Sequence, residues 1–341
     1  MKEIRTEDAV GHVLCHDLTR IVKDVEKGAA FRKGHIVTEQ DIPQLLAMGK
    51  EHLFVWEKDE TMYHEDEAAE ILRQVCQNAY MKASEAKEGK IELTAQCDGL
   101  FRVDVARLDA INEIDEIMIA TRHSNTAVRT GDKLVGTRVI PLVIQKEKME
   151  LVRQAAGQTP IAQLLPFHPY RVGIVTTGSE VYRGRIKDTF TPVIVEKVEQ
   201  FGMQVVAHAV VGDDKAQITE SIWRMKREGA EVILCTGGMS VDPDDRTPAA
   251  IRDTGARIVT YGAPVLPGAM FLLAYLDDGT PIMGLPGCVM YAKATIFDLV
   301  LPRIAAGVPV TKQEIAHMGN GGLCLGCPVC HYPICSFGKG I

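Results

Sequence analysis

The chain has 341 residues, of which 46% are hydrophobic and 24% are charged, and its formal net charge is −7. This composition predicts a globular protein of two or three domains and excludes a disordered or fibrous chain. The pI is near 5.8 and no dense cluster of lysine and arginine is present, which argues against nucleic-acid binding. We therefore expect no nucleic-acid partner, and we expect glycine loops and helix N-termini to hold any anionic ligand.

The first residues, MKEIRTEDAV, lack the apolar core of a signal peptide. The longest apolar run, residues 269–276, is too short to span a bilayer. These features indicate a cytoplasmic protein without a membrane partner. In such a protein, nine cysteines indicate free thiols or metal ligands rather than disulfides.

The first 158 residues predict a mixed α+β region. Within residues 1–60, Thr38 is expected to cap a short helix that has Glu39 and Asp41 in its first turn. Residues 61–86 carry an apolar stripe typical of a helix. Residues 98–144 are rich in valine, isoleucine and threonine, so residues 61–158 predict a lobe of helices and strands. Its last helix is expected at residues 145–160, before a hinge at residues 159–169.

Strand-like and helix-like segments alternate between residues 171 and 307, which predicts a parallel sheet with crossover helices. The expected strands are residues 172–176, 203–211, 231–235 and 256–261, and a hairpin of residues 270–276 and 281–285. The expected helices are residues 191–201, which start at Thr191 and Pro192, residues 216–227, residues 248–255 and one long helix at residues 289–305.

The predicted fold is therefore α/β. A doubly wound, mostly parallel sheet occupies residues 165–308, the mixed, strand-rich α+β region precedes it, and a cysteine-rich tail at residues 318–341 follows it.

The segment CTGGMSVDPDDRTP, residues 235–248, directly follows one of the expected buried strands. Ligands of open parallel sheets bind beyond the carboxyl ends of the strands, and glycines let backbone N–H groups approach a phosphate. Gly237 and Gly238 therefore predict ligand contact. Asp242, Asp244 and Asp245 suit a bound cation or a proton transfer. A solvated acidic loop, the alternative, leaves the paired glycines unexplained.

Two further glycine turns follow expected strands, TTGSE at residues 176–180 and GLPGC at residues 284–288. Each turn alone is equally typical of an ordinary connection. In the second, a following helix would attract a negative group. It would also lower the pKa of Cys288, but a packed thiol is the favoured interpretation of this residue. Because parallel strands end at one edge of a sheet, the three turns are expected to converge on one anion site.

The tail carries CLGCPVCHYPIC, in which two, two and four residues separate successive cysteines. Such tight thiolate spacing predicts a four-cysteine Zn²⁺ site or an iron-sulfur cluster, and the spacing does not decide between them. The expected ligands are Cys324, Cys327, Cys330 and Cys335.

The motifs VGIVTTGSE, VVGDD, CTGGMSVDPDDRTP and GLPG together resemble the molybdopterin-binding domain of molybdenum-cofactor biosynthesis proteins, over residues 171–307. Residues 11–21 and 31–55 resemble the opening of the MoeA-type molybdopterin molybdenumtransferases, also found as the E domain of gephyrin. The resemblance implies binding of the pterin dithiolene phosphate, with molybdate and Mg²⁺ as further ligands.

Several motifs depart from the family pattern. Where the insertases carry S-V-G-D-Y-D, this chain has Pro243 at the position of the first aspartate. Residues 245–248 instead resemble the R-D-V-T-P run of the MogA-type adenylyltransferases, which places Asp245 on their functional aspartate. The lysine-bearing K-P-G-K-P segment becomes LPGAM at residues 266–270, and Cys288 replaces an asparagine. Binding of molybdopterin is thus better supported than insertase chemistry.

The resemblance assigns roles to individual residues. Catalysis, by positioning Mg²⁺ or polarising the transferred group, is assigned to Asp245, Asp242 and Asp188. Cofactor binding is assigned to Thr177, Gly178, Ser179, Glu180, Asp213, Asp214, Thr236, Gly237, Gly238, Ser240, Pro267, Gly268, Pro286 and Gly287.

Two functions are compatible with this pattern. The chain is expected to bind molybdopterin, or its adenylylated form, and to act as a MoeA-like molybdenumtransferase in cofactor biosynthesis. The alternative is a non-catalytic sensor or carrier of the cofactor with a metal-binding cysteine tail, and the sequence leaves the choice open. The family resemblance also implies a homodimer and contacts with other cofactor-assembly proteins.

Overall fold

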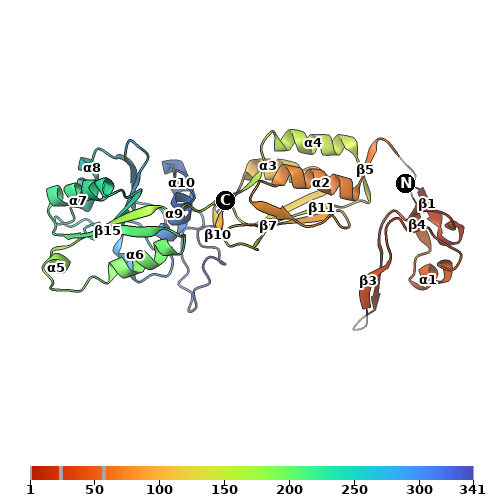
Figure 1. Cartoon of the computed structure of the whole chain (residues 1–341), viewed down its shortest axis with the longest axis horizontal. Helices are drawn as coiled ribbons and strands as arrows, with labels where there is room; N and C mark the ends of the chain where they lie inside the picture. The colour runs from red at the N-terminus through yellow and green to blue at the C-terminus, as the bar shows by residue number, and fades with distance from the viewer. Residues whose placement is uncertain (1, 23–25, 56–58, 341) are drawn as a thin grey trace. The chain divides into compact units, whose positions relative to one another are not determined.

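The computed structural model describes residues 2–22, 26–55 and 59–340 (Figure 1). Contacts divide the chain into two compact units. The first comprises Met1–Gln96, Val103–Arg122 and Thr130–Leu164, and the second comprises Cys97–Arg102, His123–Arg129 and Leu165–Ile341. The finer division into four segments stays a prediction. In the described ranges, no helix combines the length and apolar character that crossing a bilayer requires.

The first unit begins with two small antiparallel sheets. The elements are β1 (Lys2–Arg5), η1 (Thr6–Asp8), β2 (Leu18–Val22), β3 (Glu26–Phe31), α1 (Ile42–Ala47) and β4 (His52–Val55). Strand β1 pairs with β4, and β2 pairs with β3. The predicted start of a helix at Thr38 is wrong, because the Asp41 carboxylate accepts hydrogen bonds from both the backbone N–H and the hydroxyl of Thr38. These bonds hold a turn, and α1 begins only after it.

The rest of the first unit is a four-stranded antiparallel sheet covered by helices (Figure 1). Its strand order is β6-β7-β11-β9, and a separate pair is formed by β5 and β12. The elements are β5 (Met62–His64), α2 (Glu65–Cys76), β6 (Met81–Ala83), β7 (Lys90–Ala95), α3 (Val105–Asn112), β9 (Ile117–Thr121), β11 (Lys133–Val139), β12 (Val143–Gln145) and α4 (Lys146–Ala156).

The helix predicted at residues 61–86 is present only in part. Helix α2 starts at Glu65 because the Nδ1 atom of His64 accepts a hydrogen bond from the backbone N–H of Asp66, and Glu67 accepts one from that of His64. It ends at Cys76, after which Gln77 has an extended backbone. The helix predicted at residues 145–160 is confirmed as α4. The boundary between the two units at Leu164 and Leu165 falls within the hinge predicted at residues 159–169. This segment also contains a strand that was not predicted, β13 (Ala162–Pro166), in a sheet of order β10-β8-β13 with β8 (Gly99–Val103) and β10 (Thr126–Val128).

The second unit is built on a six-stranded sheet of order β15-β14-β16-β19-β18-β17. Its strands are β14 (Arg171–Thr177), β15 (Gln204–Val211), β16 (Val232–Thr236), β17 (Arg257–Tyr261), β18 (Leu272–Tyr275) and β19 (Pro281–Leu285). The first four strands in this order are parallel neighbours, and β18 runs antiparallel to both β19 and β17. The mostly parallel sheet and the predicted hairpin are therefore confirmed.

Helices cover both faces of this sheet (Figure 1). They are α5 (Ser179–Tyr182), α6 (Phe190–Glu199), α7 (Lys215–Arg227), α8 (Thr247–Asp253), η2 (Gly287–Met290), α9 (Ile296–Ala305) and α10 (Lys312–His317). Successive strand residues alternate between two cores. Ile174 and Leu234 pack with α6 and α9, whereas Val175 and Cys235 pack with α7 and α8. This alternation explains why the strands are apolar throughout, and it confirms a doubly wound sheet.

Two predicted helix starts in the second unit are wrong. The long helix expected at residues 289–305 is split into η2 and α9, because Thr295 and Asp298 form a capping box that starts a new helix. Helix α6 starts at Phe190, one residue before Thr191. The Asp188 carboxylate accepts hydrogen bonds of 2.9 Å from the backbone N–H groups of both Phe190 and Thr191.

The cysteine-rich tail is anchored to the second unit. The backbone N–H of Cys324 donates to the carbonyl of Leu266 over 2.8 Å. The Tyr332 hydroxyl donates to the carbonyl of Asp298 over 2.9 Å. Phe337 is buried in the core that contains α6 and α9. The tail is therefore fixed by packing and hydrogen bonds of its own.

Candidate functional site

Four loops follow the parallel strands of the second unit and share one edge of its sheet. They contain residues 177–179 after β14, residues 212–214 after β15, residues 237–240 after β16 and residues 286–287 after β19. We call this set of loops the sheet edge. The convergence predicted from three glycine turns is therefore present, since the strands before these loops are parallel and adjacent.

The loops after β14 and β16 are in close contact. Gly237 has a φ of 83°, and a Cβ atom on it would lie 2.2 Å from the carbonyl oxygen of Thr177. The hydroxyls of Thr177 and Thr247 are 3.1 Å apart, and that of Thr247 donates to the carbonyl of Gly237 over 2.9 Å. Both threonines are buried. Glycine is thus required here for the approach of one loop to the other.

The same loop offers backbone donors. In the part of the chain that the structure describes, no acceptor receives a hydrogen bond from the N–H groups of Gly237, Gly238, Met239 or Ser240. Both glycines have positive φ, and Met239 is buried. Consecutive backbone N–H groups in such a turn form a concavity suited to an anion. These N–H groups can therefore donate hydrogen bonds to a phosphate oxygen.

The loops after β14 and β15 are joined through a carboxylate. Asp213 accepts a hydrogen bond of 2.8 Å from the backbone N–H of Ser179, the first residue of α5. Its neighbour Asp214 accepts one of 2.9 Å from the N–H of Gln217 and so caps α7. Glu180 is exposed. The donor predicted to hold a ligand at Ser179 thus already has an acidic acceptor.

A polar cluster lies beside the end of β14. The Thr191 hydroxyl donates to the Asp188 carboxylate over 2.6 Å, and the Thr176 hydroxyl is 3.0 Å from Nε2 of His208. Burial opposes ionisation of Asp188, but hydrogen bonds from Thr191 and Phe190 outweigh it and hold its pKa below the ordinary value. The Thr236 hydroxyl, 3.3 Å from that of Thr176, is fully buried.

Sequence reasoning missed His208. The signal that could have found it is a titratable side chain within the strand-like run of residues 203–211.

The aspartate-rich loop after β16 forms a tight turn. The backbone N–H of Asp242 donates to the Asp245 carboxylate over 3.0 Å, and that of Asp245 donates to the carbonyl of Asp242 over 2.9 Å. The side chain of Asp242 is exposed, whereas Asp245 is half-buried. Among the described residues, no hydrogen bond or ion pair joins Asp188 to Asp242 or Asp245. The Asp188 carboxylate accepts hydrogen bonds from Thr176 and Thr191, whereas the Asp245 carboxylate accepts one within its own turn.

Tyr261, which the sequence did not single out, supports this loop. Its hydroxyl is within 3.2 Å of the carbonyls of Met239 and Ser240. Burial, followed by the negative charge of Asp245, raises the pKa of Tyr261. The tyrosine is therefore a neutral donor beside the Asp245 carboxylate.

The glycine turn after β19 differs from its prediction. It leads into η2, and a long helix does not follow directly. The Thr189 hydroxyl lies 3.2 Å from the sulfur of Met290, which connects this turn to the segment after β14. Burial raises the pKa of the Cys288 thiol, which agrees with the packed thiol that the sequence favoured over a thiolate. Cys288 is therefore a packed thiol.

Pro267 and Gly268 lie against the start of α9. The carbonyl of Pro267 accepts a hydrogen bond of 3.3 Å from the N–H of Ile296. A Cβ atom on Gly268 would lie 2.5 Å from Cγ2 of Ile296, so this glycine permits close packing. In the described ranges, no hydrogen bond joins either residue to the loop of residues 237–240.

The tail cysteines differ in exposure. Cys324 and Cys335 pack against the core, while Cys327 and Cys330 are exposed. Within residues 2–22, 26–55 and 59–340, no three of the four sulfurs lie within 4.8 Å of one another. As arranged, these residues do not fit a Zn²⁺ site or an iron-sulfur cluster.

A cavity of about 330 Å³ lies at the opposite edge of the sheet, where β16 and β19 begin. Of its charged lining residues, Lys226 and Asp278 pair with each other over 2.6 Å, and Lys226 also donates to the Thr280 hydroxyl. The third, Glu231, accepts a hydrogen bond of 3.0 Å from the backbone N–H of Arg171. Because these groups satisfy one another, we assign no ligand to this cavity.

Two family models match the chain. Residues 173–306 match the family described as "Probable molybdopterin binding domain". Residues 3–57 match a domain of unknown function, DUF8806.

Curated relatives match parts of the chain. A molybdopterin molybdenumtransferase of Synechococcus elongatus is 27% identical over 225 residues, which is 60% of this chain and 54% of the relative. A CinA-like protein of Mycobacterium sp. (strain MCS) is 33% identical over 81 residues, 24% of this chain and 19% of the relative. The chain thus spans about half the length of the first relative and less of the second.

Solved structures also match. The molybdopterin biosynthesis enzyme MoaB of Thermus thermophilus is 25% identical and has a TM-score of 0.32, covering 41% of this chain and 98% of that one. A molybdenum cofactor biosynthesis protein of Pyrococcus furiosus is 15% identical and has a TM-score of 0.26, covering 91% of this chain and 66% of that one.

Proposed function

Because residues 173–306 form a domain of the family described as probable molybdopterin binding domain, we propose that this chain binds molybdopterin and takes part in molybdenum-cofactor biosynthesis. The observation that carries the proposal is the run of four N–H groups, from Gly237 to Ser240, that have no acceptor in the described chain. These donors lie where parallel strands end, which is where ligands of such sheets bind.

We propose that these amides hold the phosphate of the pterin, together with the backbone of residues 177–179. Asp213 accepts the N–H of Ser179, so a phosphate at that amide has to displace a carboxylate. The amides of residues 237–240 require no such displacement. They are therefore the primary anchor, and the loop after β14 is the secondary one.

Asp245 is the proposed carboxylate for Mg²⁺. It is half-buried beside the loop of residues 237–240, and Asp242 lies in the same turn. Magnesium takes hard oxygen ligands and is commonly held by one or two carboxylates together with substrate phosphates, so this pair fits the ion. Bound Mg²⁺ would neutralise phosphate charge. Molybdate and the adenylylated pterin are the proposed further substrates.

A backbone-resolved titration tests the binding site directly. Molybdopterin added to ¹⁵N-labelled full-length protein is expected to shift the amide resonances of Gly237, Gly238 and Ser240. Gly229 and Gly279 are matched controls, because they lie at the opposite edge of the sheet. If the control resonances shift and those of residues 237–240 do not, the proposed site is wrong.

We propose that this site has the activity of a MoeA-like molybdenumtransferase. One observation favours a non-catalytic carrier instead. The segment of residues 266–270 contains no lysine, and its exposed Leu266 pairs through its backbone with Leu323 of the tail. Molybdate- and Mg²⁺-dependent conversion of bound molybdopterin would support the transferase. Tight binding without conversion would support the carrier. The homodimer and the contacts with assembly proteins stay predictions.

A further inference from the structure

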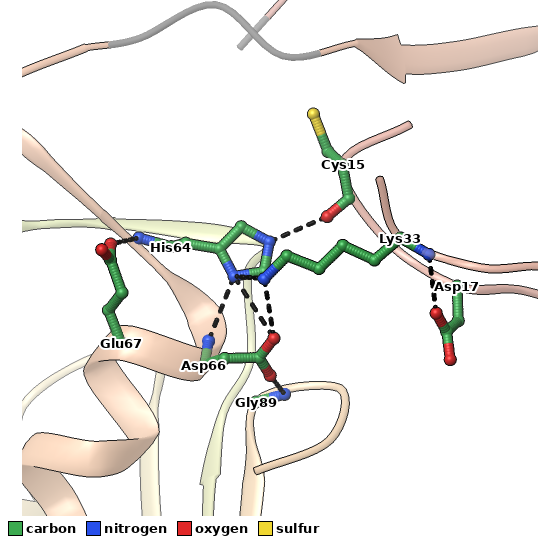
Figure 2. Close-up of polar contacts among 7 residues, drawn as sticks. All are labelled: Cys15, Asp17, Lys33, His64, Asp66, Glu67 and Gly89. Carbon is green, nitrogen blue, oxygen red and sulfur yellow. Dashed lines mark hydrogen bonds and ion pairs between the residues drawn. The ribbon is translucent and has the colours of Figure 1, made fainter. Parts of the chain in front are cut away.

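A second group of ligand-type side chains lies in the first unit, at the start of α2. His64, Glu65 and Asp66 each offer one nitrogen or oxygen atom, and these atoms lie within 4.8 Å of one another. Figure 2 shows His64 and Asp66 together with Lys33, whose side chain extends toward both. This group is independent of the sheet edge and of the function proposed for it.

The orientation of the His64 ring is fixed by a hydrogen bond of its Nε2 atom. Its ring is buried, and Nε2 lies 2.8 Å from the carbonyl oxygen of Cys15 (Figure 2). A carbonyl only accepts, so Nε2 carries the hydrogen and Nδ1 presents its lone pair on the other side. Metal-bound histidines typically donate their second nitrogen to a backbone carbonyl in this way. His64 is therefore held in the orientation of a ligand.

Asp66 is supported in the same manner. Its Oδ1 accepts a hydrogen bond of 3.2 Å from the backbone N–H of Gly89, which leaves Oδ2 directed at His64 (Figure 2). The distance from Oδ2 to Nδ1 of His64 is 3.6 Å. Two donors bound to one ion at about 2.1 Å each lie roughly 3 to 4 Å apart, so this separation suits a shared ion.

Glu65 provides an independent indication of a ligand. This residue is only 9% exposed, and in the described part of the chain its carboxylate makes no hydrogen bond and no ion pair. Buried carboxylates are normally paired or bound to a metal. One oxygen of the Glu65 carboxylate lies within 4.8 Å of the ligand atoms of His64 and Asp66.

A positive charge already lies between two of the donors. The Lys33 ammonium is 3.0 Å from Nδ1 of His64 and 2.9 Å from Oδ2 of Asp66. Lys33 belongs to the segment between β3 and α1, and its backbone N–H donates to Asp17 over 2.8 Å (Figure 2). The two donors thus form a position that binds a cation.

We propose that His64, Glu65 and Asp66 form a binding site for a divalent transition-metal ion, and that the Lys33 ammonium competes with the ion for His64 and Asp66. One imidazole and two carboxylates are a ligand set that suits Zn²⁺ or Mn²⁺. The ion takes the Nδ1 lone pair in place of both Lys33 and the backbone N–H of Asp66, and it adds a counter-charge beside Glu65.

Titration of the full chain with Mn²⁺, followed by the loss of the free-ion EPR signal, tests the proposal. Mn²⁺ prefers oxygen and nitrogen ligands, so the tail thiols do not compete for it. Lys33→Met removes the competing charge and is expected to tighten binding at least about threefold. Glu65→Gln keeps the shape of the side chain and is expected to weaken binding roughly 10- to 100-fold, as changes around metal sites commonly do.

The Asp245→Asn variant separates this site from the sheet edge, because it removes the carboxylate that is proposed to hold Mg²⁺ there and that would also bind Mn²⁺. Its Mn²⁺ affinity at this site should equal that of the unmodified chain, and circular dichroism should show all variants to be folded. The proposal is overturned if Glu65→Gln binds as tightly as the unmodified chain. It is also overturned if neither the unmodified chain nor Lys33→Met binds Mn²⁺, or if Asp245→Asn alone abolishes binding.

Discussion

The Asp213 carboxylate accepts a hydrogen bond of 2.8 Å from the backbone N–H of Ser179, at the edge of the sheet where a phosphate is proposed to bind. The carboxylate and an incoming phosphate are both acceptors, so they exclude each other at this amide. The loop after β14 is therefore blocked by a charge of the same sign as the ligand.

Asp213→Asn should consequently strengthen anion binding. The substitution removes a negative charge, and we expect the affinity for molybdopterin to rise about 2- to 10-fold at low ionic strength. Isothermal titration calorimetry measures the change. Asp214→Asn is the control, since it alters the net charge equally while an asparagine still caps α7. Equal gains in both variants would point to a general effect of net charge.

Gly237→Ala should destabilise the second unit. The new Cβ would lie 2.2 Å from the carbonyl of Thr177 at a residue with positive φ, so we expect a loss of about 1–3 kcal/mol in the free energy of unfolding. Gly255→Ala is the control, because Gly255 also has a positive φ but has open space where the Cβ would lie. Its loss of stability measures the backbone strain alone. Urea denaturation of the two variants compares them. Equal stabilities would show that the two loops separate readily.

Asp245→Asn should impair transfer while leaving the pterin bound. If this carboxylate holds Mg²⁺, its loss should lower the rate of molybdenum transfer on the order of 100-fold. Binding of molybdopterin through the amides of residues 237–240 should persist. Rate and affinity are measured on the same preparation, with Asp244→Asn as the exposed control. An unchanged rate would remove Asp245 from the proposed chemistry.

Asp278 should titrate at unusually low pH. A hydrogen bond from Lys226, followed by one from the backbone N–H of Thr280, lowers its pKa to about 2. Because the folded-state pKa lies below the unfolded value, the pair stabilises the fold at pH above about 4. That contribution is lost as pH falls toward 2. Carboxyl ¹³C shifts should report the low value, and Lys226→Met should raise it. A normal pKa in the unmodified chain would contradict the pairing.

Phe337 should anchor the tail independently of any metal. It is 4% exposed within the core, so Phe337→Ala should cost about 3–5 kcal/mol of unfolding free energy. Cys327→Ser and Cys330→Ser change exposed thiols and should leave the stability unchanged. Thermal denaturation with and without a chelator compares the three variants. A large loss in the serine variants, or on chelation, would indicate a bound metal in the tail.

The strands of the second unit could be predicted because their signals are local. Each short apolar run is ended by glycine or hydroxyl residues, and parallel strands necessarily bring those ends to one edge. The glycine pair was also predicted correctly as a special position. The reason why glycine is needed there was only partly predicted. Gly237 is required because a Cβ atom would clash with the carbonyl of Thr177, which lies sixty residues earlier in the chain.

Helix starts were less predictable where side chains decide them. Thr295 and Asp298 have the spacing of a capping box, but the apolar residues before them suggested one continuous helix. Asp188 caps α6 from just outside the helix. This signal is local, but Thr191 and Pro192, a few residues later, are an equally typical helix start. The group at His64 depends on Cys15 and Lys33, both far away in the sequence, so no local pattern could have revealed it.

The buried hydroxyl pair of Thr177 and Thr247 connects residues that are seventy positions apart. Together with the hydrogen bond from Thr247 to Gly237, this contact holds the ends of β14 and β16 rigidly together. A ligand that contacts either loop therefore binds to a preformed surface, and these loops lose little conformational entropy on binding.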